Sequence, residues 1–195
     1  MHQLLLATRN SHKTREFSET LGAGFVVRDL SGEWEAPAIE ETGATFAENA
    51  ILKAIAISKQ FAGLVVADDS GLEVDALHGA PGVYSARYAG RDAKDSENIV
   101  RLFLELRKCA DERPFAARFR CVLALARSGE MLGTFEGAVE GTIVDPPRGA
   151  AGFGYDPVFQ PEGLTQTFAE LPSAEKNRIS HRARAIRLLR VELLI

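Results

Sequence analysis

The sequence predicts an α/β protein with a mixed β-sheet, and three observations support this. Short apolar runs alternate with helix-like segments through the first half of the chain. Two long strand-like runs then follow each other around a short polar turn. No repeat, low-complexity tract or flexible linker interrupts the 195 residues, so we expect a single domain over residues 1–195.

The first half of the chain is predicted to contain three strands and two helices. Each strand is a short apolar run, and the first helix ends at the stop signal Leu21-Gly22. Thr45 followed by Glu48 has the spacing of a capping box, which opens the second helix. We expect strands at 3–8, 25–30 and 64–69, helices at 11–21 and from 45 onward, and a loop at 31–43.

The second half is predicted to contain a helix, a β-hairpin and a long terminal helix. Apolar residues on one side of 96–108 indicate an amphipathic helix. The runs at 118–126 and 131–144 flank a turn and are typical of a hairpin. A loop with glycines and prolines follows at 145–154, and an apolar stripe predicts one helix from Ser173 to the end.

The composition is that of an ordinary globular protein and argues against a nucleic-acid-binding or membrane-spanning protein. Hydrophobic residues make up 46% and charged residues 26% of the chain, and the net charge of −4 argues against nucleic acid as the main partner. The chain starts without the basic and apolar segments of a signal peptide, and no apolar run approaches the ~20 residues of a membrane span. Cys109 and Cys121 form no metal-binding pattern, so we expect a reduced, cytoplasmic protein with no membrane partner.

The stretch from Leu64 to Leu72 is the most informative segment for function. An apolar run leads into Asp68 and Asp69 and then meets Ser70-Gly71, which predicts a buried strand followed by a turn. Ligands of open α/β sheets bind beyond the carboxyl ends of the strands. Two carboxylates there can hold Mg²⁺ and activate a water, which points to phosphate chemistry. The alternative is an aspartate pair that only caps a turn.

Two other segments of the first half carry polar groups at helix starts. Residues 8–13 lie between a strand and a helix, where backbone N–H groups, Thr8, Asn10 and Lys13 suit a phosphate, unless the segment is a plain N-cap. Neither a Walker loop nor a Rossmann fingerprint is present. The acidic pair at 40–41 precedes the second helix, on which Asn49 and Lys53 share a face. That face points either toward phosphates or toward solvent.

Two segments of the second half suit a nucleobase. The glycine-rich loop at 149–157 carries Phe153, which can stack on a base, and Asp156, which can orient the base or ribose. The alternative places these aromatics in the core, which we favour for Tyr155. Residues 175–182 open the terminal helix with basic groups, which are unfavourable near a helix start unless an anion binds there. Lys176 and Ser180 are expected on one face of that helix.

In this order and spacing, the segments resemble the inosine triphosphate pyrophosphatase family, the RdgB-like purine nucleoside triphosphatases, over essentially the whole chain. Arg9 stands where a glycine is frequent, and Ala151 departs from the usual glycine-rich turn; neither is a proposed catalytic group. The matching pieces are TxxNxxK at Thr8, Asn10 and Lys13, EETG and TFAENAxxKA between Glu40 and Ala54, ADDSGLEVDAL from Ala67 to Leu77, GAPGVYSARYAG from Gly79 to Gly90, a GGFGYDPVF-like loop from Ala151 to Phe159, and EKNxISHR from Glu175 to Arg182.

The resemblance implies a Mg²⁺-dependent hydrolase that cleaves ITP, dITP and XTP to the monophosphate and pyrophosphate, and so removes deaminated purines from the nucleotide pool. It implies an elongated central mixed sheet flanked by helices, two lobes with an active-site cleft between them, and a homodimer.

The resemblance also implies roles for single residues. Asp69 is the general base and a metal ligand, and Glu40 completes the Mg²⁺ site, with Asp68 or Glu41 as alternatives. Lys13 and Lys53 neutralise the triphosphate. The other expected substrate contacts are Thr8, Arg9, Asn10, Ser11, His12, Ser70, Phe153, Gly154, Tyr155, Asp156, Lys176, His181 and Arg182.

Base selectivity has a physical basis in this assignment. Hypoxanthine and xanthine present a 6-oxo acceptor where adenine presents an amino donor. Donors from Lys176, His181 or Arg182 aimed at that oxygen would leave adenine unpaired, and such mismatches reject an analogue by orders of magnitude. Guanine shares the 6-oxo group, so its rejection must act at the 2-amino group.

Two other functions stay open on the sequence. A Maf-like pyrophosphatase for a pyrimidine or modified nucleotide has a similar architecture, but the ISHR string and the FGYDP loop favour purines. A non-catalytic nucleotide or RNA binder could use the basic terminal helix, but the net acidity and the two adjacent aspartates argue against it. A Nudix hydrolase is not supported, because the chain has no glutamate-rich Nudix helix.

Overall fold

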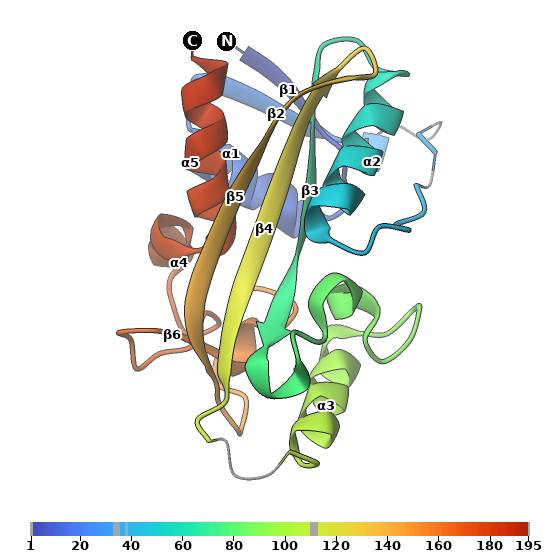
Figure 1. Ribbon diagram of the computed structural model, residues 1–195. Coiled ribbons are helices and arrows are strands. Elements are labelled where there is room, and N and C mark those ends of the chain that lie inside the picture. The colour runs from blue at the N-terminus through green and yellow to red at the C-terminus, as the bar shows by residue number, and fades with distance from the viewer. Residues whose placement is uncertain (1, 33–35, 38, 110–112, 195) are drawn as a thin grey trace. The chain divides into compact units, whose positions relative to one another are not determined.

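In a computed structural model, the described residues form a six-stranded mixed sheet with helices beside it, as predicted (Figure 1). The structure describes residues 2–32, 36–37, 39–109 and 113–194. The strand order is β2-β1-β3-β4-β5-β6, with β1 parallel to β2 and β3, and β5 antiparallel to β6. The strands span His2–Leu6 (β1), Phe25–Asp29 (β2), Leu64–Val74 (β3), Ala116–Arg127 (β4), Glu130–Ile143 (β5) and Phe159–Pro161 (β6).

The α-helices begin and end largely where the sequence predicts. The first coincides with the predicted helix, and Asn10 caps its start by accepting hydrogen bonds from backbone N–H groups. Thr45 and Glu48 form the predicted capping box at the start of the second. The helices of the described chain are α1 (Ser11–Leu21), α2 (Phe46–Ser58), α3 (Asp95–Leu106), α4 (Ser173–Ile179) and α5 (His181–Leu193).

The chain divides into two compact units, each with its own hydrophobic core. Unit 1 comprises Met1–Asp69, Cys121–Gly137 and His181–Ile195. Unit 2 comprises Ser70–Arg120 and Ala138–Ser180. The strands β3, β4 and β5 contribute residues to both units. That both units together form the expected single domain stays a prediction, as does the expected cleft between two lobes.

The core of unit 1 joins β1, β3 and β4 to α1 and α5. Phe17 of α1 and Ile186 and Leu189 of α5 are completely buried there. Helix α1 packs against both β2 and α5. Figure 1 shows α5 and α2 on opposite sides of the long strands. The carboxyl ends of β1 and β2 and the start of α1 are therefore held in one rigid body.

The core of unit 2 centres on three phenylalanines. The ring centroids of Phe119 on β4 and Phe159 on β6 lie 4.7 Å apart, and Phe168 lies 5.9 and 5.2 Å from them. Such edge-on and offset contacts stabilise a core beyond the area that they bury. Leu102 of α3 and the end of β3 pack into the same cluster.

The predicted β-hairpin is present and has the turn that its sequence favours. The strands β4 and β5 are neighbours in the sheet and are joined by Ser128 and Gly129, with φ angles of 53° and 86°. Positive φ at both central residues is the type I′ geometry, whose twist matches that of paired strands. The Gly129 N–H also donates to Ser58 Oγ at 3.0 Å, which ties the turn to α2.

The strand that carries the two aspartates is longer than predicted. The sequence predicts a turn at Ser70-Gly71, but β3 continues through it to Val74. Leu72 and Val74 are fully buried in the core of unit 2. Burial and strand pairing therefore outweigh the weak turn preference of Ser-Gly, because the preference of a residue for strand depends mainly on its packing.

The single terminal helix that the sequence predicts is in fact two helices. Helix α4 ends at Ile179 and α5 begins at His181, because Ser180 is extended, with φ −63° and ψ 157°. Ile179 packs against the core of unit 2, whereas Ile186 is part of the core of unit 1. Ser180 lies outside both helices, so the predicted common helix face of Lys176 and Ser180 is wrong.

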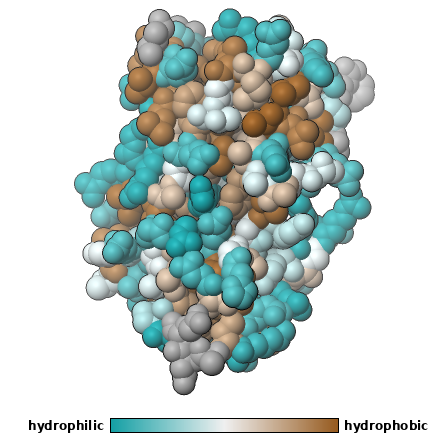
Figure 2. All heavy atoms as spheres, viewed as in Figure 1, coloured by the Kyte–Doolittle hydropathy of each residue, from teal (hydrophilic) through white to brown (hydrophobic). Residues whose placement is uncertain are grey.

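Apolar side chains gather on the surface of unit 1. Figure 2 shows them at the upper end of the view, over the elements of this unit. Among the exposed large apolar residues, Leu188, Val191 and Leu194 are spaced three apart along and just beyond α5 and so share one side of it. Within the described ranges, none of the helices has the length and apolar character that crossing a membrane requires.

One glycine of unit 1 permits the close approach of β5 to α5, which makes a test of this packing. A Cβ atom at Gly137 would lie 2.2 Å from the His181 carbonyl oxygen and 2.7 Å from the Ala185 nitrogen. We expect Gly137→Ala to lower the free energy of unfolding by about 3 kcal/mol, because backbone atoms cannot yield as side chains do. Denaturant unfolding measures the loss.

The matched control lies on the same strand. A Cβ atom at Gly133 would meet only the end of the Phe135 ring, at 3.3 Å. Gly133→Ala should therefore leave stability within about 0.5 kcal/mol of the parent. Equal stabilities of the two variants would contradict the close packing of β5 on α5.

Candidate functional site

The two aspartates keep the place that the sequence predicts, although their strand does not end there. Strand β3 pairs in parallel with β1 up to Leu6, which lies opposite Val66. Asp68 and Asp69 therefore come just beyond the carboxyl end of β1, where ligands of open α/β sheets bind. Their exposed fractions are 2% and 6%.

Asp68 is the centre of a buried network of charges in unit 1. Its Oδ2 accepts a hydrogen bond from Arg182 Nε at 2.7 Å, and its Oδ1 accepts one from Lys13 Nζ. Arg182 Nη1 also donates to Glu16 Oε2 at 2.5 Å. The network ties α1, β3 and α5 together. It also means that Arg182, a predicted base-reading residue, has two of its donors on carboxylates.

The charges around Asp68 fix its protonation state. Burial alone would raise its pKa, but Arg182 and Lys13 outweigh burial and hold the pKa of Asp68 well below its usual value. Burial and the neighbouring Asp68 carboxylate raise the pKa of the Cys121 thiol, which donates to Asp68 Oδ2 at 3.3 Å. Asp68 is thus ionised at neutral pH and is paired with two cations.

Asp69 has the opposite electrostatic character. Lys53 Nζ donates to its Oδ1 at 3.1 Å, and Asn49 Nδ2 donates to its Oδ2 at 3.2 Å. Burial raises the pKa of Asp69, and the negative charge of Glu41 adds to this, while Lys53 and Lys13 only partly oppose the shift. Adjacent carboxylates whose pKa values are driven apart are typical of a catalytic site, where the group with the raised pKa handles the proton.

Lys53 contacts Asp69, Glu41 and the backbone of Asp68, and these contacts show which way its helix face points. Its Nζ donates to Glu41 Oε1 at 2.7 Å and to the Asp68 carbonyl oxygen at 2.9 Å, as well as to Asp69. Burial lowers the pKa of Lys53, but the carboxylates of Asp69 and Glu41 raise it more, so the net shift is upward and the side chain stays a cation. The face shared by Asn49 and Lys53 points to the aspartates, not to solvent.

The segment 8–13 joins β1 to α1, as predicted. Asn10 Oδ1 accepts hydrogen bonds from the N–H groups of His12 at 2.9 Å and Lys13 at 3.3 Å. Two of the N–H groups expected to be open to phosphate are thus used by the N-cap itself. The side chains of Ser11 and His12 are exposed, whereas that of Lys13 reaches Asp68.

A cavity of about 260 Å³ lies beside these residues within unit 1. Thr8, Arg9 and Lys53 line it, together with apolar residues such as Pro37 and Ile39. Arg9 Nη2 donates to the Ala36 carbonyl oxygen at 2.8 Å, so this side chain braces the loop that forms one wall. Three of the predicted substrate-binding residues, Thr8, Arg9 and Lys53, therefore line this cavity.

The donor set around Lys53 fits a divalent cation. Its ammonium lies 2.7 Å from Glu41 Oε1 and 3.1 Å from Asp69 Oδ1, so one positive charge already stands between two carboxylates. Glu40, the predicted metal partner, is exposed and has no hydrogen bond or ion pair with any residue that the structure describes. Of the alternatives, Asp68 is paired with cations, and Glu41 lies in contact with Lys53.

No three His, Cys, Asp or Glu side chains gather into a metal-binding cluster within the described ranges.

Unit 2 holds the predicted base-binding residues Phe153, Asp156 and Lys176, whereas His181 and Arg182 belong to unit 1. Asp156 Oδ2 accepts hydrogen bonds from the Phe153 N–H at 2.9 Å and from Lys176 Nζ at 2.6 Å. The Lys176 ammonium also lies 5.0 Å from the centre of the Phe153 ring, within cation–π range. A Cβ atom at Gly152 would lie 2.0 Å from Asp156 Oδ2, so the loop requires glycine there. The half-buried Phe153 ring is thus held by a buried ion pair.

Three other predicted substrate contacts of unit 2, Tyr155, Gly154 and Ser70, lie outside the Asp156–Lys176 ion pair. Tyr155 is in the core, as favoured, and its hydroxyl donates to the Ser85 carbonyl oxygen at 2.9 Å. The Gly154 N–H donates to Asp95 Oδ2 at 2.6 Å. Ser70 is half-buried on β3. The predicted His181 opens α5 in unit 1, where it is buried.

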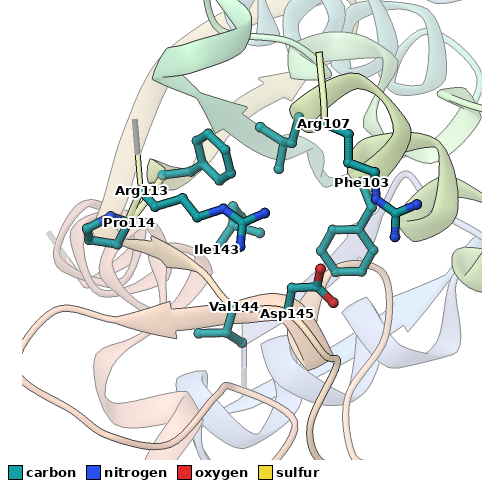
Figure 3. A pocket seen from close by; sticks show the side chains of 9 residues that line it. Phe103, Arg107, Arg113, Pro114, Ile143, Val144 and Asp145 are labelled. Carbon is teal, nitrogen blue, oxygen red and sulfur yellow. The ribbon is translucent and has the colours of Figure 1, made fainter. Parts of the chain in front are cut away.

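A second cavity lies in unit 2, with a volume of about 420 Å³ (Figure 3). Apolar side chains such as Phe103 and Phe115 form its walls, and its charged groups, Arg107, Arg113 and Asp145, are exposed. None of its lining residues belongs to the predicted site. It is a surface hollow between the end of α3 and the strands β4 and β5.

The structure adds two residues that the sequence does not single out as site residues. Glu16 lies within a polar helix and accepts a hydrogen bond from Arg182, a contact that the sequence does not reveal because the two residues are far apart in the chain. Asn49 is visible in the sequence as a neighbour of Lys53, but its contact with Asp69 follows from the packing of α2 on β3. The helix spacing of Asn49 and Lys53 was the available signal.

With the site described, comparison with known proteins identifies the family. A model of the Ham1 family matches residues 4–192. The chain belongs to the Ham1 family. It is 50% identical to proteins named dITP/XTP pyrophosphatase from Bacillus licheniformis and Bacillus subtilis, over 97% of this chain and 96% of each relative. This confirms the resemblance that the motifs indicate.

Solved structures of Ham1 proteins share the fold. One from Coxiella burnetii has a TM-score of 0.89 and 42% identity, covering 100% of this chain and 99% of the other. One from Staphylococcus aureus has a TM-score of 0.85 and 41% identity, covering 98% of each chain. The predicted α/β class, with a mixed sheet flanked by helices, is confirmed.

The buried network around Arg182 generates a prediction about stability and its pH dependence. At pH 7, Arg182→Leu should lower the free energy of unfolding by about 3–5 kcal/mol, because two buried carboxylates lose their partner. The pKa of folded Asp68 lies below its ordinary 3.8, so its ion pairs stabilise fully above that pH and are lost as the pH falls below it. The deficit of the variant should therefore shrink in acid.

Denaturant unfolding at pH 7 and at pH values below 3.8 measures this difference. The exposed Arg187 on the same helix supplies the control, and Arg187→Leu should stay within about 0.5 kcal/mol of the parent at every pH. A deficit of Arg182→Leu that is independent of pH would show that packing, not charge, is lost.

Proposed function

We propose that this protein hydrolyses non-canonical purine nucleoside triphosphates, namely ITP, dITP and XTP, to the monophosphate and pyrophosphate. The observation that carries the proposal is Asp69, a buried carboxylate with a raised pKa, held between Lys53 and Asn49 beyond the end of β1. Relatives that are 50% identical carry the name dITP/XTP pyrophosphatase. Site and family thus support the same reaction.

In the proposed reaction, a water oxygen attacks the α-phosphorus and its proton passes to Asp69. The bond from the α-phosphorus to its bridging oxygen breaks, and pyrophosphate leaves with that oxygen. Asp69 is suited to accept this proton because Lys53 and Asn49 hold its two carboxylate oxygens in place beyond the end of β1. Asp68 does not compete for it, because Arg182 and Lys13 keep it ionised and paired.

The cations of unit 1 handle the phosphate charge. Lys53 is a buried cation beside Asp69, and Lys13 is a partly exposed one on Asp68. Both can turn toward a triphosphate, and such neutralisation is the main contribution to phosphoryl chemistry. Mg²⁺, when bound by Asp69 with Glu41 or the predicted Glu40, would polarise the phosphate and lower the pKa of the attacking water.

For the base, we favour Lys176 over Arg182 as the donor that recognises the 6-oxo group. Lys176 is an ammonium with three donors beside the half-buried Phe153 ring, which offers a face for stacking. Arg182 already donates to Asp68 and Glu16. Asp156 would act through Lys176 by holding its ammonium, and His181 stays a predicted contact.

The alternatives are less well supported. A non-catalytic binder would not require the opposite pKa shifts of Asp68 and Asp69. A Maf-like pyrophosphatase for another nucleotide would use the same phosphate chemistry and differ only in the base. Homodimer formation and a cytoplasmic location stay predictions.

The proposed reaction is tested by pyrophosphate release from ITP, XTP, GTP, ATP, dTTP and UTP at matched concentrations with Mg²⁺. We expect turnover of ITP and XTP at rates orders of magnitude above ATP, because adenine lacks the 6-oxo acceptor. EDTA should abolish turnover. Preference for dTTP or UTP would retain the phosphate chemistry and overturn the base assignment, whereas no turnover on any of them would favour a binding protein.

The general base is tested by Asp69→Asn, which keeps the shape of the side chain and removes the proton acceptor. We expect kcat for ITP to fall by about 10²–10⁴-fold, while the protein stays folded by circular dichroism. The exposed Asp92 provides the control, and Asp92→Asn should behave as the parent. Activity retained by Asp69→Asn would move the base to another residue.

A further inference from the structure

We propose that Asn49 is a positioning residue that fixes the Asp69 carboxylate relative to the acidic loop at 40–43. This inference rests on the proposed function and extends it to a residue that does not itself touch the substrate. Its side chain lies on α2 and is completely buried, with an exposed fraction of 0%. A buried amide that is costly to desolvate is retained only where both its ends are bound.

Both ends of the Asn49 amide are bound, and each to a different part of the site. Nδ2 donates to Asp69 Oδ2 at 3.2 Å, and Oδ1 accepts from the Gly43 N–H at 2.8 Å. These partners determine which end is nitrogen, because an ionised carboxylate only accepts and a backbone N–H only donates. The amide therefore links the proposed base directly to the loop backbone.

Asn49 acts together with Lys53, one turn further along α2. Asn49 holds Oδ2 of Asp69, and Lys53 holds Oδ1 at 3.1 Å, so two donors from one helix face fix the plane of the carboxylate. The start of that helix is itself fixed by the capping box of Thr45 and Glu48. Donors on a capped helix are more precisely placed than donors on a loop.

On its other side, Asn49 is in tight contact with the loop. A Cβ atom at Gly43 would lie 2.6 Å from Glu48 Cβ and 2.8 Å from Asn49 Oδ1, so only glycine permits this approach. Glu41, two residues upstream, reaches Lys53 Nζ at 2.7 Å. Asn49 thus links Asp69 to the loop that carries Glu40 and Glu41, the two carboxylates that could share a metal with it.

The residue type matches this role. Aspartate at position 49 would lose the donor and bring a second negative charge against Asp69, and alanine would leave both partners of the amide unsatisfied. Leucine has the same branched shape without hydrogen-bonding groups, although its methyl groups are larger, so Asn49→Leu removes the link without leaving the cavity that alanine would create.

A second buried asparagine provides a matched control in unit 2. Asn98 has an exposed fraction of 2%, its Oδ1 accepts from the Ala89 N–H at 2.8 Å, and its Nδ2 donates to the Ala86 carbonyl oxygen at 3.2 Å. It bridges backbone groups in the same manner, but it contacts none of the proposed catalytic residues. Asn98→Leu therefore reports the cost of losing a buried amide bridge alone.

The experiment measures three quantities for the parent and both variants: the free energy of unfolding, kcat and KM for ITP with Mg²⁺, and Mn²⁺ affinity of the nucleotide-free protein by electron paramagnetic resonance. Both variants should lose similar stability. Only Asn49→Leu should lose about 10- to 100-fold in kcat, with KM nearly unchanged, and about 10- to 100-fold in Mn²⁺ affinity, the range found when groups that orient metal ligands are removed.

The proposal is overturned if Asn49→Leu keeps the kcat and Mn²⁺ affinity of the parent, or if Asn98→Leu loses both equally. If Asn49→Leu does not fold, Asn49→Ser replaces it, with Asn98→Ser as its control and the same outcomes. If the parent does not hydrolyse ITP, the proposed function fails, while the Mn²⁺ comparison still decides whether Asn49 positions Asp69.

Discussion

The contact between Asp68 and Arg182 is the constraint on which the site of unit 1 depends. Both side chains are almost completely buried, and a buried charge without a partner is strongly destabilising. Each therefore holds the element of the other in place, Asp68 on β3 and Arg182 on α5. Glu16 and Lys13 extend the network to α1. The start of α1 and the end of the parallel part of β3 thus meet in one fixed geometry.

This network separates the tasks of two adjacent carboxylates. Asp68 is paired with Arg182 and Lys13, which hold its pKa well below its usual value, and it connects the elements of unit 1. Burial raises the pKa of Asp69, the nearby carboxylate of Glu41 adds to this, and Lys53 and Lys13 oppose the shift only in part. Neighbours in a strand point to opposite sides, and the two side chains therefore meet different helices: α1 and α5 on one side, α2 on the other. A strand that runs through the site, rather than ending at it, makes this division possible.

Unit 2 contains a smaller buried ion pair of the same kind. Asp156 holds the Lys176 ammonium against the Phe153 ring, so a cation and an aromatic face are presented together. The close contact of Gly152 with the Asp156 carboxylate shows how tightly the loop is built around this pair. Each unit thus contains its own buried ion pair, Asp68 with Arg182 in unit 1 and Asp156 with Lys176 in unit 2.

The sequence alone determined the fold class, the capping box and the hairpin, and it supplied the candidate residues of the site, because these depend on local periodicity and on motif spacing. Tertiary structure decided the rest. Strand β3 continues past Ser70-Gly71 because Leu72 and Val74 enter a core that forms only in the fold. Ser180 breaks the last helix because its two halves serve different cores. The partners of Arg182 and Asn49 likewise required three dimensions, since charge and hydrogen-bond pairing between distant residues leaves no periodic signal in a single sequence.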